Sequence, residues 1–148
     1  MCATFLSACV VPPTLEEAPP SQNSPPAILR DQVLPDPGLL THTAGADEDL
    51  TLDLIPVTDP NVEDKLTLRL LLDGIQVRTL PPLLTGGELR EFRNVDVGQP
   101  CDFIDAGLVG LLVGVVSDRD FAGAGREVPA EAGTSSVEWV IACLDPPL

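Results

Sequence analysis

Two acidic turns carry the side chains best suited to bind a cation. The first turn offers the oxygens of Asp59, Asn61, Glu63 and Asp64, and the second those of Asp118 and Asp120. Ca²⁺ takes about six to eight such oxygen ligands. Neither turn fits the EF-hand pattern D-x-[DN]-x-[DN]-G, and Pro60 restricts the first. Because solvated carboxylates that bond locally are usual in such turns, we expect that role, with a structural calcium site at residues 59–64 as the alternative.

Side chains suited to catalysis are scarce. His42 is the only histidine, and it lies in a short polar stretch outside any clear strand. No G-x-S-x-G or H-E-x-x-H motif surrounds it, and the glycine-rich residues 107–114 lack the lysine of a phosphate-binding loop. Carboxylate pairs for glycoside hydrolysis are recognised by their separation in space, so the sequence leaves them open. We expect an exposed His42 in a loop, no catalytic residue and no enzyme activity.

Cys9 is the third candidate for chemistry. It ends the segment Leu6-Ser7-Ala8-Cys9, and a Pro- and Ser-rich stretch follows at residues 10–26. This pattern resembles bacterial lipoproteins, whose signal peptides end in a small-residue turn before a cysteine that is acylated. The resemblance implies that residues 1–8 are part of a signal peptide, although no Lys or Arg precedes Cys9 as is usual. It implies lipidation of Cys9 and attachment to the cell envelope; otherwise Cys9 is a plain thiol near a chain end.

The residues after Cys9 indicate which membrane would hold the protein and how the domain is connected to it. Val10 stands where Asp is a common inner-membrane retention signal in the lipoprotein family, so the resemblance implies the outer membrane. Proline doublets in residues 10–26 favour an extended polyproline conformation. We expect residues 9–26 to form a semi-rigid tether and residues 27–146 to form one domain.

The lipoprotein resemblance also implies a separate role for each of the four cysteines. The chain has four; Cys2 would leave with the signal peptide and Cys9 would take the lipid. Cys101 and Cys143 then remain as a pair in an exported domain, where disulfides persist. We expect a Cys101–Cys143 bridge. The alternatives are reduced thiols in a cytosolic protein, or a metal site, for which the chain offers no C-x-x-C motif and one histidine.

Charge limits the partners. With eight Lys and Arg against 23 Asp and Glu, the formal net charge is −15. Proteins that bind nucleic acid neutralise phosphates with Lys and Arg, so we expect no nucleic-acid partner, and anionic headgroups would repel the chain as well. Acidity of this kind favours a soluble monomer. Membrane attachment would therefore have to come from acyl chains.

The most apolar run, residues 108–116, is too short to span a bilayer, because a transmembrane helix needs about 20 residues. Gly110 and Gly114 have the G-x-x-x-G spacing of packed membrane helices, which counts only within a longer apolar stretch. We expect this run to be a strand that is buried on both faces.

Apolar and polar residues alternate in three segments, as in strands that bury one face of a sheet. The alternating residues are Leu50, Leu52 and Leu54; Leu66, Leu68, Leu70 and Leu72; and Val137, Trp139, Ile141 and Cys143. Asp73-Gly74 predicts a two-residue hairpin loop between residues 65–72 and 75–80, and Val33-Leu34-Pro35 predicts a first edge strand. Together with sixteen prolines, this pattern predicts an all-β fold, an antiparallel sandwich.

Residues 50–74, with the segment V-T-D-P-N-V-E-D-K-L, resemble the part of immunoglobulin-like and PKD-like modules in which an acidic turn joins two strands. Residues 113–118 resemble their penultimate strand. The resemblance implies an immunoglobulin-like β-sandwich, with a jelly roll or small barrel as the alternative. The chain departs from true immunoglobulin domains because Trp139 and Cys143 share a strand and tyrosine is absent. We expect Trp139 in the core, shielding the disulfide.

These patterns favour a lipid-anchored envelope protein with a structural or protein-interaction role, whose partners are the membrane, through its lipid, and other envelope proteins. The alternative is a cell-surface module that binds calcium, carbohydrate or a peptide.

Overall fold

The computed structural model describes residues 24–83, 87–105, 107–118 and 134–146. Its strands are β1 (Ala27–Ile28), β2 (Leu39–Thr43), β3 (Leu50–Thr58), β4 (Thr67–Leu72), β5 (Ile75–Thr79), β6 (Leu89–Gly98), β7 (Val109–Ser117) and β8 (Thr134–Leu144). Two short 3₁₀ turns, η1 (Arg30–Gln32) and η2 (Pro100–Asp102), complete the described elements.

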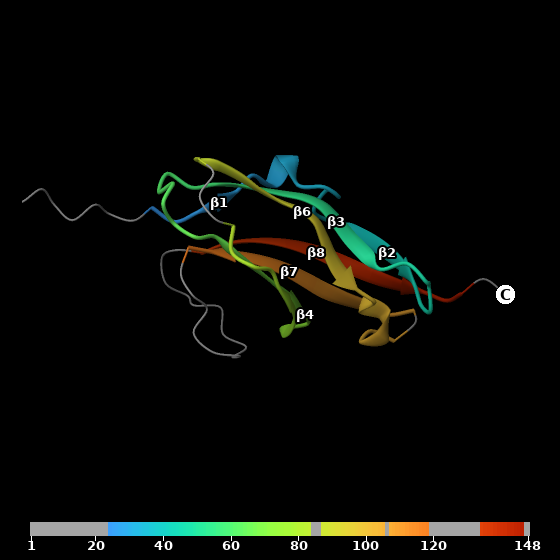
Figure 1. The fold of residues 1–148 in the computed structure, drawn as a ribbon. Coiled ribbons are helices and arrows are strands. Elements are labelled where there is room, and N and C mark those ends of the chain that lie inside the picture. The colour runs from blue at the N-terminus through green and yellow to red at the C-terminus, as the bar shows by residue number, and fades with distance from the viewer. Residues whose placement is uncertain (1–23, 84–86, 106, 119–133, 147–148) are drawn as a thin grey trace, which may run out of the picture.

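The strands form two sheets that pack face to face (Figure 1). One sheet has three strands in the order β1-β3-β6, and the other has five in the order β2-β8-β7-β4-β5. The predicted all-β sandwich is confirmed. With β1, β3 and β6 taken as immunoglobulin strands A, B and E, and β4, β7 and β8 as C, F and G, the strands have the same neighbours as in that fold.

One strand pair differs from the antiparallel prediction. The chain leaves β1 in the three-stranded sheet, crosses to the other sheet without reversing, and runs as β2 parallel to β8, with Leu39 opposite Val140. The crossing contains η1 and a cis peptide bond between Leu34 and Pro35. The predicted edge strand at residues 33–35 is therefore wrong: only an isolated bridge joins Leu34 to Leu54.

His42 was expected in a loop, and that prediction is also wrong. It lies on β2 opposite Cys143 and is half-buried. The sequence Leu39–Thr43 has little apolar alternation, and its strand conformation comes from hydrogen bonding to β8. Tertiary context overrides local preference here.

The Asp73-Gly74 hairpin is confirmed. Leu72 pairs with Ile75, and both turn residues have positive φ, 48° for Asp73 and 77° for Gly74. Two successive positive φ values define the type I′ turn, whose twist matches that of the flanking strands.

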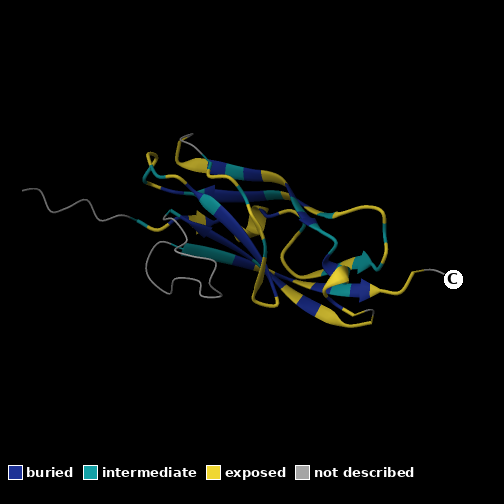
Figure 2. Ribbon diagram, turned by 60° about the horizontal axis from the view of Figure 1, so that its bottom comes forward, coloured by how far each residue is buried: buried dark blue, intermediate teal, exposed yellow. Residues whose placement is uncertain are grey.

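Residues 108–116 form a strand as expected, but only part of it is buried on both faces. In β7, Val115 and Val116 are buried, whereas Val109 and Leu111 are exposed. The first half of β7 therefore presents one face to solvent, as the alternating exposed and buried bands in Figure 2 indicate.

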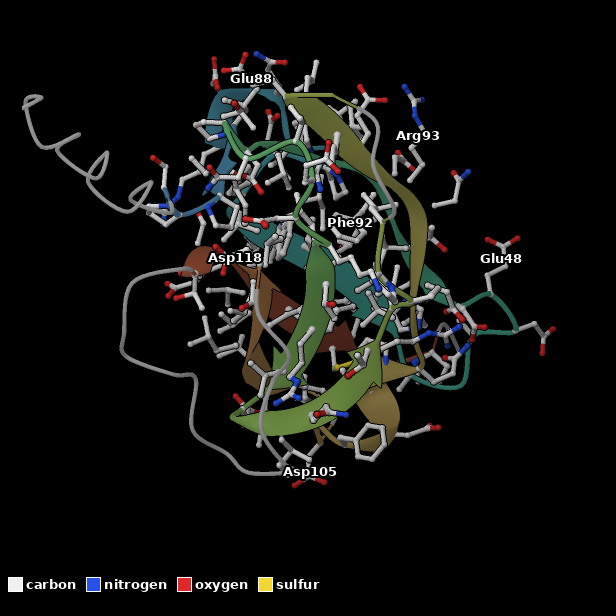
Figure 3. All side chains as sticks on the ribbon, turned by 60° about the vertical axis from the view of Figure 1, so that its left-hand side comes forward. Glu48, Glu88, Phe92, Arg93, Asp105 and Asp118 are labelled. Atoms are coloured by element: carbon white, nitrogen blue, oxygen red, sulfur yellow. A yellow bond between two sulfur atoms is a disulfide. The ribbon has the colours of Figure 1, made fainter. Side chains whose placement is uncertain are left out.

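Alternating residues from both sheets fill the core. Trp139 and Leu68 of the five-stranded sheet are fully buried, and Phe92 of β6 points in between the sheets (Figure 3). The Trp139 indole Nε1 donates a 3.1 Å hydrogen bond to the Pro35 carbonyl. A Cβ atom at Gly114 would lie 3.4 Å from Trp139 Cζ3, so this glycine serves close packing against the indole. The predicted core position of Trp139 is confirmed.

Candidate functional site

The two ends of the sandwich carry the candidate sites from the sequence. We call the end that holds Arg90 and the turn 59–64 the arginine end. The disulfide end holds the Cys101–Cys143 bridge, the Asp73-Gly74 turn and the loop between β2 and β3. Hydrogen bonds between Leu111 and Asp73, and between Ala44 and Leu144, bring these last parts together.

At the arginine end, the acidic turn wraps around a guanidinium group. Arg90, the second residue of β6, donates to the carbonyl oxygens of Gly87, Asn61 and Asp64. Its side chain is 3% exposed and lies 3.9 Å from the carboxylate of Asp59, which is fully buried. The other Asp59 oxygen accepts the backbone N–H of Asn61 at 2.9 Å. Backbone carbonyls and one buried carboxylate thus hold a cation that belongs to the chain itself.

This arrangement uses the turn that was the calcium candidate. Asn61 turns its amide away and donates to the Ser24 carbonyl at 3.0 Å, and Glu63 is exposed. Within the described ranges, no group of three or more His, Cys, Asp or Glu side chains lies close enough to hold a metal ion. The carbonyl oxygens of Asn61 and Asp64 and the carboxylate of Asp59 therefore face the Arg90 guanidinium.

The second acidic cluster is only partly described. Asp118 follows β7 and is half-buried near the arginine end (Figure 3), whereas Asp120 lies outside the described residues. The pair therefore adds no arrangement from which a site can be built.

At the disulfide end, His42 belongs to a polar network. Its Nε2 lies 3.1 Å from Gln99 Oε1, and the Gln99 amide donates to the Glu48 carbonyl and the Asp49 carboxylate, both at 3.0 Å. These bonds fasten the loop between β2 and β3 to the end of β6. The network holds a loop in place, and the Asp49 carboxylate joins it through the Gln99 amide rather than through the imidazole.

The predicted disulfide is confirmed. Cys101 in η2 and Cys143 in β8 are bonded, with their Cα atoms 5.6 Å apart. Cys143 is buried and Cys101 is half-buried, 3.6 Å from the His42 carbonyl oxygen. The bond ties the connection after β6 to β8 and so fixes the backbone around the disulfide end.

Beside the disulfide end, apolar side chains gather on the outer face of the five-stranded sheet. Val140 of β8 lies between Leu39 of β2 and Leu111 of β7, opposite both. Two residues further along β8, Ala142 lies opposite Val109 of β7. Directly opposite residues project from the same face, and their neighbours Leu112 and Ile141 point into the core. We call this surface the outer apolar face. Its large members are 39–67% exposed: Leu39, Val109, Leu111, Val140 and Leu144.

Two further exposed apolar side chains lie at the disulfide end. Phe103 follows η2 and is 71% exposed, and Leu108 precedes β7 and is 56% exposed. Leu108 is bonded to β8, since its carbonyl accepts the N–H of Cys143. Each cysteine of the disulfide thus has an exposed apolar residue near it: Phe103 follows Cys101 in the chain, and Leu108 is hydrogen-bonded to Cys143.

The alternation of core residues did not reveal the outer apolar face, although the sequence holds a signal for it. In β7 and in the second half of β8, the positions between the core residues are also apolar: Val109, Leu111 and Val113 in one strand and Val140, Ala142 and Leu144 in the other. Such runs usually indicate strands covered on both faces. Here the described residues leave the second face open.

The lipidation candidate Cys9 and the tether through residue 23 lie outside the described residues. In the part that is described, no helix is long and apolar enough to cross a membrane. Comparisons with protein-family models, with curated proteins and with solved structures find no match.

Proposed function

We propose that this chain is a lipid-anchored envelope protein that binds another protein through the outer apolar face. The observation that carries the interaction role is that face itself, with five large aliphatic side chains exposed on three adjacent strands. Scattered exposed leucines are ordinary, whereas a contiguous apolar patch on a soluble domain indicates an interaction surface.

The position of the two chain ends fits this role. The described chain starts beside Asn61 at the arginine end and finishes after Leu144 at the other (Figure 1). A lipid on Cys9 and a proline-rich tether would hold the arginine end toward the bilayer. The outer apolar face would then point away from the membrane, where a partner protein can reach it.

The anchor is tested by mass spectrometry of the protein extracted from the membranes of cells that express it. We expect a peptide that begins at Cys9 and carries acyl mass, and loss of membrane association in Cys9→Ser. Recovery of the chain in the cytosol with an unmodified Cys9 would contradict the anchor.

The interaction role is tested by photo-crosslinking from single sites in the same cells. A crosslinking residue at position 111 should give one dominant protein adduct. The same residue at position 89 should not, because Leu89 is more exposed than Leu111 (53% against 41%) but lies at the arginine end. Equal or absent adducts at the two positions would contradict binding through this face.

A further inference from the structure

The carboxylates of the described domain are distributed unevenly between its two ends. Seven exposed acidic residues lie at the disulfide end: Asp47, Glu48, Asp49, Asp73, Asp102, Asp105 and Asp145. Figure 3 shows Asp105 and Glu48 projecting from loops at the surface of the molecule. None of the seven forms an ion pair with another described residue.

Some of these carboxylates border the outer apolar face directly. Asp73 is hydrogen-bonded to both backbone groups of Leu111, and Asp145 follows Leu144. Glu138 of β8 is exposed opposite Val113, two residues along each strand from the Leu111–Val140 pair. The apolar surface therefore has acidic groups along three of its borders.

The described cations lie elsewhere. Arg30 bonds to the Ser136 carbonyl at the start of β8, Arg90 is buried at the arginine end, and Arg78 and Arg93 pair with Asp96 and Glu91. Lys65 precedes β4 at the arginine end. Arg69 of β4 is buried opposite Val115, about 13 Å along β7 from Leu111 at roughly 3.3 Å per residue.

We propose that the outer apolar face binds a segment of a partner protein that combines basic and apolar side chains. This inference rests on the interaction role proposed above and adds the chemistry of the partner. Apolar partner side chains would cover Leu39, Leu111 and Val140, while Lys or Arg side chains would meet the carboxylates around them. Complementary charge of this kind raises the association rate and excludes wrong partners.

The same charges argue against two other occupants. A second copy that used this face symmetrically would bring the acidic groups that border it, Asp73, Asp145 and Glu138, toward the same groups of the other copy, and like charges facing each other oppose association. An anionic lipid surface would repel the disulfide end for the same reason. A cationic segment is the occupant that gains from both the apolar and the acidic side chains.

The test is a calorimetric titration of the purified full chain with a synthetic amphipathic peptide of Lys and Leu. We expect saturable binding that weakens as salt rises, because exposed charges are screened over a Debye length of about 10 Å at 0.1 M salt. A peptide with Glu in place of Lys, and one with Ser in place of Leu, should each bind at least tenfold more weakly. Equal binding of the all-polar basic peptide would overturn the proposal, since charge alone would explain it.

Paired variants locate the binding. Leu111→Ser should weaken binding about tenfold, as expected for a central apolar contact, and Leu89→Ser should change it less than twofold.

The second pair of variants tests the charges. Asp73→Asn with Asp145→Asn should weaken binding and make it less dependent on salt. Glu63→Gln with Glu88→Gln removes the same amount of charge at the arginine end and should not have that effect. Asn is well suited to the positive φ of position 73, so the hairpin should be kept. Equal effects of the two members of a pair would overturn the proposal.

Other occupants give different results. Flotation with phosphatidylglycerol or phosphatidylcholine vesicles that depends on Leu111 would assign the face to a lipid surface, and concentration-dependent dimerisation lost in Leu111→Ser would assign it to a second copy; either overturns the proposal. An unacylated Cys9 would refute the anchor without affecting this titration. An acidic or uncharged partner crosslinked at position 111 would keep the interaction role and overturn only the inference about charge.

Discussion

The two ends of the sandwich use acidic residues in opposite ways. At the arginine end, Asp59 is buried and its turn surrounds the guanidinium of Arg90. At the disulfide end, the carboxylates are exposed, lack a partner among the described cations, and lie beside uncovered aliphatic side chains. The first arrangement pairs a buried carboxylate with a buried guanidinium inside the fold, and the second leaves both charge and apolar surface available to another molecule.

This contrast separates the residues that should matter for stability from those that should matter for binding. Substitutions at the arginine end should lower the free energy of unfolding. Substitutions on the outer apolar face should leave the fold intact and change only association. The covalent bond at the disulfide end is the exception, because it constrains the backbone that carries the binding surface.

The largest effect on stability is expected from the disulfide. Cys101→Ala with Cys143→Ala opens a loop between residues separated by 42 positions, and the chain-entropy model gives a loss of about 4 kcal/mol. Urea unfolding followed by Trp139 fluorescence measures it. A loss below roughly 1 kcal/mol would mean that the fold holds the disulfide end without the bond.

Arg90→Ala is expected to cost about 3 kcal/mol, because it leaves the buried carboxylate of Asp59 uncompensated and the carbonyls of Asn61 and Asp64 without their donor. The same urea titration measures this loss. Arg93→Ala is the matched control, since Arg93 pairs with Glu91 on the surface and exposed ion pairs contribute roughly 0–1 kcal/mol. Similar losses in the two variants would contradict the distinction between buried and exposed arginines.

Leu111→Ser and Leu39→Ser should change the free energy of unfolding by less than about 0.5 kcal/mol, as is usual for exposed positions. Chemical unfolding of each variant beside the parent chain checks this. A loss of 2 kcal/mol or more would show that these side chains are covered within the folded chain, and the outer apolar face would then be part of the core.

Calcium should have the smallest effect. Because Arg90 contacts the carbonyls of the turn, we expect millimolar Ca²⁺ to shift the melting temperature by less than about 1 °C, the size of effect that weak ion binding produces through mass action. Thermal unfolding with and without chelator measures it. A clear rise that disappears in Asp59→Ala would restore the calcium hypothesis and remove the contrast between the two ends.

The sequence predicted the features that depend on neighbours along the chain. Strand alternation located Trp139 in the core, and Asp73-Gly74 located the hairpin, because each depends on local side-chain periodicity or backbone preference. The Cys101–Cys143 bridge was expected on the lipoprotein resemblance, since that left the two cysteines as a pair.

Features set by distant contacts were missed. His42 lies on a strand because β8 is beside it, and the acidic turn contains a guanidinium because β6 starts next to it. Exposure of Val140 and Leu111 depends on what covers the sheet, which alternation alone does not encode. The lipid on Cys9 remains a prediction.

The most direct test of the contrast between the two ends is an amide NMR titration of the isotope-labelled chain with the Lys and Leu peptide. We expect the largest shift changes on β2, on β8 from Val140 to Leu144, on the first half of β7 and on Asp73, with little change from Asp59 to Asp64. Changes centred on the arginine end, or spread evenly over the domain, would contradict it.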